Sequence, residues 1–314
     1  MADGTLSRGG QGYGTLAYSV GHRPNRISAL KGRVMKTKHL LFVTVVMAIL
    51  LGWATVALSQ NSDPAGSRPG DGRTLTVFAA ASLTDVFQSL AAAFSEEHGD
   101  VQVIFNFAGS QQLAHQLAQD APADVFASAD AIQMEVAVFS GRVRLDNVAP
   151  FAGNRLLIAM PADNPGRVTS LQDLARSGLK LVIADEGAPI GHYTQTMLAN
   201  ADGAPEFSSG FSKQVNDNII SYERNVRAVL SKVMLGEVDA GVVYWSDVMP
   251  ARAETLATAT IPDDVNVFAA YPIAPVADSP DPALAAAFVD FVRSPAGQEI
   301  LASFGFLPAS ALGK

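Results

Sequence analysis

The chain has 314 residues, of which 48% are hydrophobic, and its net charge is −8. It contains no cysteine, which excludes disulfides, thiolate metal sites and a cysteine nucleophile. The charge is uneven, because residues 60–314 carry fifteen Lys and Arg against 29 Asp and Glu, a net charge of −14. An acidic body argues against non-specific binding of nucleic acid. A bound anion would therefore have to be held by local dipoles and hydrogen-bond donors.

A candidate export signal occupies residues 35–59. Residues 35–39 are basic, residues 40–53 are apolar, and Ala57 and Ser59 place small residues at the −3 and −1 positions of a cleavage site. The alternative is an uncleaved membrane anchor, because the apolar stretch can be extended to 19 residues. Either interpretation predicts export to the periplasm or the cell envelope.

The segments on either side of this signal carry no periodic apolar pattern. Residues 1–34 are rich in Gly, Ser and Arg, and we interpret them as disordered or as a mis-assigned translation start. Residues 60–72 are rich in Pro, Gly, Ser and Asp, which is typical of a flexible linker. We therefore expect the folded body to begin near residue 73.

The body alternates between apolar runs and amphipathic stretches. Apolar runs typical of strands cover residues 74–77, 101–107, 125–127, 155–160, 179–184, 240–244 and 265–276. Helical spacing predicts helices that begin near residues 82, 110, 131, 171, 219, 281 and 294, and one that runs through residue 198. Residues 201–217 are expected to be a loop or a poorly ordered helix. Strands that alternate with helices favour a parallel α/β sheet, with a ligand beyond the carboxyl ends of the strands.

The length of the body predicts two domains. It spans about 245 residues, more than most single domains contain. The chain is expected to cross between the domains near Gly153 and near Tyr271-Pro272. The first domain would then be discontinuous, made of residues 73–153 and 273–314, and the second would comprise residues 154–272.

Two of the expected helices begin with a serine after small residues. Ser82 opens the first, and Asp85 three residues later fits a capping box. Ser110 opens the second, directly after Ala108-Gly109. The first N–H groups of a helix have no partner within the helix and can hold an anion.

Two further junctions and one tyrosine extend this pattern. Residues 185–193 join a strand to a helix through small residues, and residues 219–227 are predicted to open another helix. Tyr244 lies at the end of a buried strand. All of these junctions offer hydroxyl or backbone N–H donors, and these donors carry no formal positive charge. They suit a fully deprotonated oxyanion, whose oxygens only accept hydrogen bonds. An anion that keeps a proton, such as phosphate, would place its O–H group against other donors and would be rejected.

Motifs for catalysis are weak or missing. The nucleophile elbow G-x-S-x-G is absent, because its nearest match, Ala108-Gly109-Ser110, is followed by two glutamines. His192 is the one histidine at a helix start, and a lone histidine there is more often a surface residue than a base. No zinc or nucleotide motif occurs, and no carboxylates form an evident catalytic pair. We therefore expect no enzyme and no cofactor.

Several motifs occur in the order found in a known family. They are Val77-Phe-Ala-Ala-Ala-Ser-Leu83, Ala121-Pro-Ala-Asp-Val-Phe-Ala-Ser-Ala-Asp130, Pro189-Ile-Gly-His-Tyr193, Asn225-Val-Arg227, Gly241-Val-Val-Tyr-Trp-Ser-Asp247 and Tyr271-Pro272. From about Leu75 to Leu307 the chain resembles the periplasmic molybdate-binding proteins of bacterial ABC importers. The resemblance implies a type II periplasmic-binding-protein fold with two α/β lobes and a hinged ligand cleft. It also implies a monomer that captures molybdate or tungstate and delivers it to a membrane permease and its ATPase.

The resemblance also assigns ligand-binding residues. It implies an oxyanion held by the hydroxyls of Ser82, Ser110 and Tyr244 and by the backbone amides of Ile190 and Val226. Molybdenum would be bound only as the oxyanion, through these same residues. Sulfate or another tetrahedral oxyanion stays open as the ligand, because the donors would be the same. An exported serine hydrolase that uses Ser82 or Ser110 is the alternative from another class.

Overall fold

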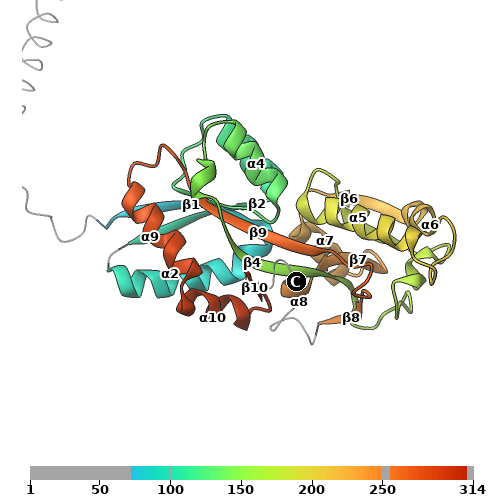
Figure 1. Ribbon diagram of the computed structural model, residues 1–314. Helices are drawn as coiled ribbons and strands as arrows, with labels where there is room; N and C mark the ends of the chain where they lie inside the picture. The colour runs from blue at the N-terminus through green and yellow to red at the C-terminus, as the bar shows by residue number, and fades with distance from the viewer. Residues whose placement is uncertain (1–71, 100, 249–254, 310–314) are drawn as a thin grey trace, which may run out of the picture. The chain divides into compact units, whose positions relative to one another are not determined.

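Ten strands form a single mixed sheet in the described part of the computed structural model, which covers residues 72–99, 101–248 and 255–309 (Figure 1). The strands are β1 Thr74–Ala80, β2 Gln102–Ala108, β3 Val125–Ala127, β4 Ala149–Pro161, β5 Leu181–Ala184, β6 Ile219–Glu223, β7 Ala240–Tyr244, β8 Leu256–Thr260, β9 Phe268–Pro275 and β10 Leu307–Pro308. Their order is β2-β1-β3-β9-β4-β7-β5-β6, and β8 and β10 pair with β4. The expectations for residues 1–71 lie outside the described residues.

Nine α-helices and three 3-10 segments complete the described ranges. The helices are α2 Thr84–His98, α3 Ser110–Ala118, α4 Ala131–Phe139, α5 Pro189–Gly203, α6 Phe211–Asp217, α7 Val226–Met234, α8 Trp245–Val248, α9 Pro282–Arg293 and α10 Pro295–Ser303. The 3-10 segments are η1 Ala81–Leu83, η2 Leu145–Asn147 and η3 Gln172–Ala175. The α/β class predicted from the sequence is confirmed.

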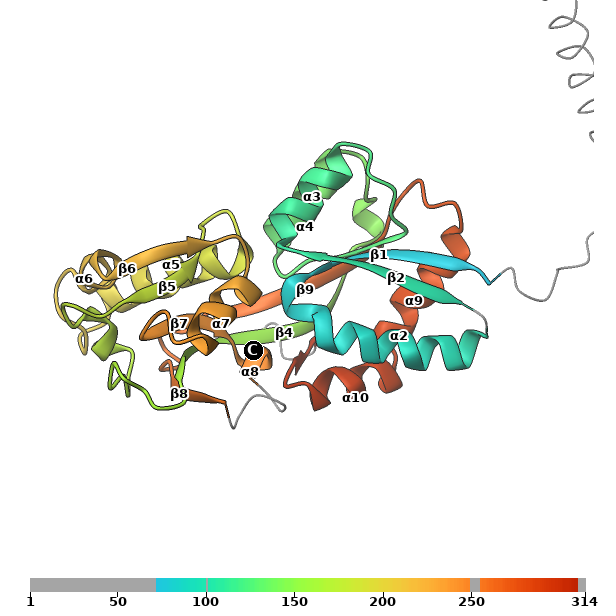
Figure 2. The ribbon, with the colours of Figure 1, turned by 180° about the vertical axis from the view of Figure 1, so that it is seen from behind.

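The sheet is mixed, and the expectation of a parallel sheet is wrong for its centre. β1 pairs in parallel with β2 and β3, and β5 pairs in parallel with β6 and β7. The long strands β4 and β9 are antiparallel to each other, with Gly153 opposite Ala270 and Ala152 opposite Tyr271. An isolated extended run has no feature that distinguishes these two pairings. Figure 2 shows β4 and β9 joining the β1–β3 side of the sheet to the β5–β7 side.

Residues 219–223 form β6, so the prediction of a helix from residue 219 is wrong. In this strand Ile219, Ser221 and Glu223 are half-buried, whereas Ile220 and Tyr222 are exposed. Such alternation is the period of a strand. The helix begins later, at Val226, where the side chain of Asn225 accepts a hydrogen bond from the Ala228 N–H.

Four further elements differ from expectation. Residues 211–217 form α6 within the segment predicted as loop or poorly ordered helix. The helix expected from residue 171 is the short 3-10 segment η3, without a side-chain cap. β8 and β10 were not predicted, because each is short and depends on pairing with β4. By contrast, α9 and α10 begin where the sequence predicts, and the side chains of Asp281 and Ser294 cap them.

Hydrophobic side chains cover both faces of the sheet around β1. Val77 and Ala79 belong to the large core cluster that includes Phe87 and Leu90 of α2. Phe78 points to the opposite face and packs in a second cluster with residues of α3 and α4. β1 is therefore buried on both sides, which fixes the position of its carboxyl end and of the serine that follows.

Candidate functional site

Ser82 lies in a 3-10 turn between β1 and α2. It is buried, and its Oγ lies 3.1 Å from the Oη of Tyr271. The predicted capping box is wrong. α2 begins at Thr84, and its N-cap residue is Leu83, whose side chain cannot accept a hydrogen bond from the helix N–H groups. The turn moves the helix start two residues beyond Ser82. The hydroxyl is therefore free for contacts outside the helix.

Ser110 is the first residue of α3, and its side chain is buried. Its Oγ accepts a hydrogen bond from the backbone N–H of Ala129, at 3.0 Å. Because that N–H can only donate, the hydroxyl hydrogen of Ser110 is left to point elsewhere. Ser110 thus connects the start of α3 to the loop that precedes α4 while keeping one donor.

Ile190 supplies the first N–H of α5. Pro189 before it has no N–H and its ring favours the first helical position. Gly191 after it packs closely, since a Cβ there would overlap the carbonyl oxygen of Asp185. These neighbours fix the direction of the Ile190 amide. The bulky Ile190 side chain is itself buried.

Val226 is the first residue of α7 and lies in the junction of residues 219–227. The Asn225 side chain caps this helix through the Ala228 N–H, at 3.0 Å. The N–H of Val226 precedes the capped position and has no carbonyl partner within the helix. It therefore remains available to a ligand at the helix start.

Tyr244 ends β7 with a hydroxyl that lacks a partner. The residue is only 1% exposed, and among the described residues its Oη makes no hydrogen bond. Burial, with smaller contributions from Tyr271 and nearby acids, raises its pKa well above 10.0. The phenol thus keeps its proton and can donate. A buried donor without a partner costs free energy, about 1–3 kcal/mol, unless a ligand satisfies it.

One small cavity brings the predicted site residues together. Its lining includes Ser82, Ser110, Ile190, Val226 and Tyr244. The remaining lining residues are Ala80, Ala81, Gly109, Ala129, Ala188, Pro189 and Asn225. The empty space among them, counted together with the part open to solvent, is about 220 Å³. Among the described residues the lining contains no Lys, Arg, Asp or Glu, so hydroxyl and amide dipoles dominate its chemistry.

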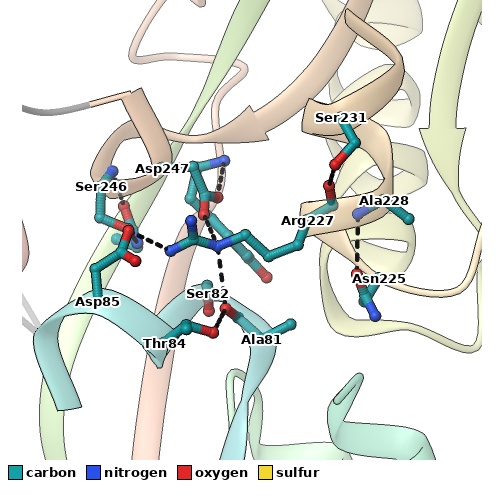
Figure 3. Close-up of polar contacts among 12 residues, drawn as sticks. Ala81, Ser82, Thr84, Asp85, Asn225, Arg227, Ala228, Ser231, Ser246 and Asp247 are labelled. Carbon is teal, nitrogen blue, oxygen red and sulfur yellow. Dashed lines mark hydrogen bonds and ion pairs between the residues drawn. The ribbon is translucent and has the colours of Figure 1, made fainter. Parts of the chain in front are cut away.

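A charged cluster lies beside this neutral lining (Figure 3). The Arg227 guanidinium bonds to Asp85, at 2.8 Å, and to the carbonyl oxygen of Ala81, at 3.2 Å. Its Nε also lies 3.6 Å from the buried carboxylate of Asp247. With one cation and two carboxylates, the cluster adds no net positive charge near the cavity.

Sequence reasoning missed three polar residues that support the site. Tyr271 bonds to Ser82, Asn154 contacts Tyr271, and Arg227 bonds beside Ser82. Tyr271 and Arg227 stand inside motifs that the sequence analysis singled out. Asn154 carries a weaker signal, since it is a polar residue within an apolar stretch.

The described ranges hold neither a metal centre nor a membrane span. Among these residues no three His, Cys, Asp or Glu side chains gather as ligands for a metal ion. Nor does any helix within them have the length and apolar character needed to cross a bilayer.

Comparison with known proteins identifies the family. Residues 75–307 match the family described as bacterial extracellular solute-binding protein. The chain belongs to this family. It is 37% identical to the molybdate-binding protein ModA of Mycobacterium tuberculosis over 84% of this chain and 96% of that protein. These matches confirm the resemblance to molybdate-binding proteins seen in the sequence.

Solved structures show that the fold of this family member is that of two-lobed periplasmic binding proteins. The Azotobacter vinelandii periplasmic molybdate-binding protein matches with a TM-score of 0.65 at 20% identity, over 74% of this chain and 98% of that one. The sulfate-binding protein SubI of Mycobacterium tuberculosis matches with a TM-score of 0.67 at 23% identity, over 75% and 87%.

Proposed function

We propose that this protein captures molybdate, and also tungstate, in the cavity lined by Ser82, Ser110, Ile190, Val226 and Tyr244. The observation that carries the proposal is the buried Tyr244 hydroxyl, which lines the cavity and has no partner among the described residues. Two serine hydroxyls and two helix-start amides surround the same space. These groups match the oxygens of a fully deprotonated tetrahedral anion, which only accept hydrogen bonds.

The energy available from such a site is sufficient for capture. A hydrogen bond to a charged group contributes about 1.5–3 kcal/mol. Five such bonds sum to about 7.5–15 kcal/mol, against roughly 8 kcal/mol for micromolar binding, and the surplus over most of this range offsets part of the cost of association. Micromolar or tighter affinity is therefore expected without any charged residue in the lining.

The choice of molybdate is supported by the relatives. ModA of Mycobacterium tuberculosis, named as a molybdate-binding protein, is 37% identical over most of both chains. Sulfate is the second candidate, because SubI shares the fold and is named as a sulfate-binding protein. Its lower identity, 23%, makes sulfate the weaker choice.

Delivery and movement complete the proposal. The protein is exported, acts as a monomer, and hands the anion to the permease and ATPase of an ABC importer without catalysing a reaction. Residues 73–153 with 273–314 form one lobe and residues 154–272 the other. The two crossings between them fall in the paired strands β4 and β9, which favours closure as a hinge motion about these strands.

Calorimetric titration of the purified protein with molybdate, tungstate, sulfate and phosphate tests the function. We expect saturable binding of one molybdate or tungstate per chain, weaker binding of sulfate and little heat with phosphate. Absence of heat with molybdate would refute the proposal, and tighter binding of sulfate would replace it with the second candidate. A serine hydrolase would instead be labelled covalently by a serine-directed phosphonate, which we expect not to happen.

A further inference from the structure

Three buried side chains form a line of hydrogen bonds that ends at the cavity. The amide of Asn154 lies 3.5 Å from the Oη of Tyr271, and that Oη lies 3.1 Å from the Oγ of Ser82. Asn154 and Tyr271 are both fully buried. Neither lines the cavity. Tyr271 reaches the lining through its hydrogen bond to Ser82 and through an edge contact with the ring of Tyr244, and of these two contacts only the hydrogen bond can orient the Ser82 hydroxyl.

The backbone fixes which way the Asn154 amide faces. Its Oδ1 accepts from the N–H groups of Arg155, at 3.0 Å, and Ser246, at 3.4 Å. Backbone N–H groups only donate, so the oxygen must face them. The Nδ2 then faces the Ser246 hydroxyl, at 2.7 Å, and the Tyr271 hydroxyl. Asn154 therefore presents a hydrogen to Tyr271.

The direction of this contact sets the direction of the next one. Because the Tyr271 oxygen faces an N–H, its own hydrogen turns to the Oγ of Ser82. Burial raises the pKa of Tyr271 well above 10.0, which keeps that hydrogen in place. Ser82 then accepts from Tyr271, and its one hydrogen is directed to the cavity.

We propose that Asn154 and Tyr271 are specificity-determining positioning residues, which hold Ser82 as a donor toward the ligand and so exclude protonated oxyanions. The inference rests on the proposed oxyanion function of the cavity. Molybdate accepts the hydrogen of Ser82. Hydrogen phosphate carries one P–O–H group, which needs a hydrogen-bond acceptor. With Ser82 fixed as a donor, its Oγ cannot accept the hydrogen of that group.

Two substitutions change the direction without removing Ser82. Tyr271→Phe keeps the ring and removes the hydroxyl, so Ser82 becomes free to accept or donate. Asn154→Asp replaces the N–H donor with an acceptor of the same shape. The Tyr271 hydrogen would then turn to the introduced carboxylate, and the Ser82 hydrogen would turn to Tyr271, away from the ligand. Asn154→Asp therefore reverses the direction of the hydrogen bonds from residue 154 to Ser82, so it should change the selectivity between molybdate and phosphate more than Tyr271→Phe does.

A matched control removes a phenol hydroxyl outside this line. Tyr193 is half-buried, and its hydroxyl bonds to the backbone of Ala270 and does not line the cavity. Tyr193→Phe should leave the affinities for both anions within about twofold of the unmodified protein. Circular dichroism and thermal unfolding establish that each variant is folded before its binding is compared.

The deciding experiment measures molybdate and phosphate affinities of the full chain at mildly alkaline pH, where phosphate keeps one proton. Tyr271→Phe should weaken molybdate binding about tenfold, which is the scale of one misdirected hydrogen bond to a charged ligand. It should also lower the ratio of the molybdate affinity to the phosphate affinity. Asn154→Asp should lower this ratio further. Variants that weaken both anions in equal proportion, or neither, would overturn the inference. Failure of the unmodified protein to bind molybdate would instead refute the proposed function itself.

Discussion

Arg227 and Asp85 form an ion pair, with 2.8 Å between Nη2 and Oδ2, that joins the start of α7 to the start of α2. These two helices begin on either side of the cavity, next to Val226 and Ser82 respectively. The same guanidinium bonds to the carbonyl oxygen of Ala81, whose peptide continues into the Ser82 N–H. The pair therefore links the two proposed lobes close to the proposed anion site.

Asp85→Asn should speed the release of molybdate. Because Asp85 is 43% exposed, the pair contributes only about 0.5–1 kcal/mol, which corresponds to a dissociation rate about two- to fivefold faster. Stopped-flow displacement of molybdate by excess tungstate measures this rate. Asp217→Asn removes an exposed pair within α6 and provides the control. Equal dissociation rates in the two variants would show that the Arg227–Asp85 pair does not help to hold the lobes closed.

Ser82→Ala should weaken molybdate binding by about 1–3 kcal/mol, because one hydrogen bond to the anion is lost. Calorimetry measures the change. Ser231→Ala is the matched control, since Ser231 lies on α7 and its hydroxyl donates to the Arg227 carbonyl of its own helix. An affinity unchanged by Ser82→Ala would exclude Ser82 from the site.

Tyr244→Phe should separate binding from stability. The hydroxyl has no partner among the described residues, so its removal should leave the ligand-free protein as stable as before, or more stable by up to about 1 kcal/mol. Molybdate affinity should nevertheless fall at least tenfold. Urea unfolding without ligand, combined with calorimetry, tests both statements. A large loss of stability would show that the hydroxyl has a structural partner instead.

Gly109→Ala should hinder closure of the cavity. A Cβ at residue 109 would lie 2.7 Å from the carbonyl oxygen of Arg224, across the cavity next to Asn225. We expect molybdate to bind several-fold more weakly, with the unfolding of the ligand-free protein little changed. Gly203→Ala, where no atom lies within 4 Å of the new Cβ, is the control. Unchanged molybdate affinity in Gly109→Ala would mean that the two segments do not need this close approach.

Asp130→Asn should stabilise the protein increasingly as pH rises. Burial raises the pKa of the Asp130 carboxyl above 3.8, against smaller opposing effects of hydrogen bonds from Gln133 and Ser128. A raised pKa gives a stabilisation that is present below 3.8 and is lost as pH rises through the folded value. The variant keeps the cap on α4 and removes this loss.

Urea unfolding from about pH 3 to 7 checks the effect of Asp130→Asn. The difference in unfolding free energy between the variant and the unmodified protein should grow toward neutral pH. A constant difference across this range would show that Asp130 has no raised pKa.

Ser82 and Ser110 could be predicted from sequence because each follows a strand that ends in small residues, and Tyr244 because it ends a buried strand. Strand ends at one edge of a sheet meet in space, so Ser82, Ser110 and Tyr244 could be expected in one place. Their arrangement in a single cavity agrees with that expectation.

Long-range polar contacts could not be predicted in the same way. The partner of Ser82 is Tyr271, 189 residues away, and no local pattern connects them. The capping box at Ser82 was wrong because a 3-10 turn delays the helix by two residues. The sequence predicts a helix at residues 219–223 because the helix cap, Asn225, comes only two residues after the end of β6.

A crystal structure of the protein with molybdate tests the central claim most directly. We predict one anion in the cavity, with its oxygens about 2.7–3.2 Å from the hydroxyls of Ser82, Ser110 and Tyr244 and the amides of Ile190 and Val226. No charged side chain should contact it. An anion bound elsewhere, or one held directly by the Arg227 guanidinium, would contradict the account of a neutral site built from dipoles and hydroxyls.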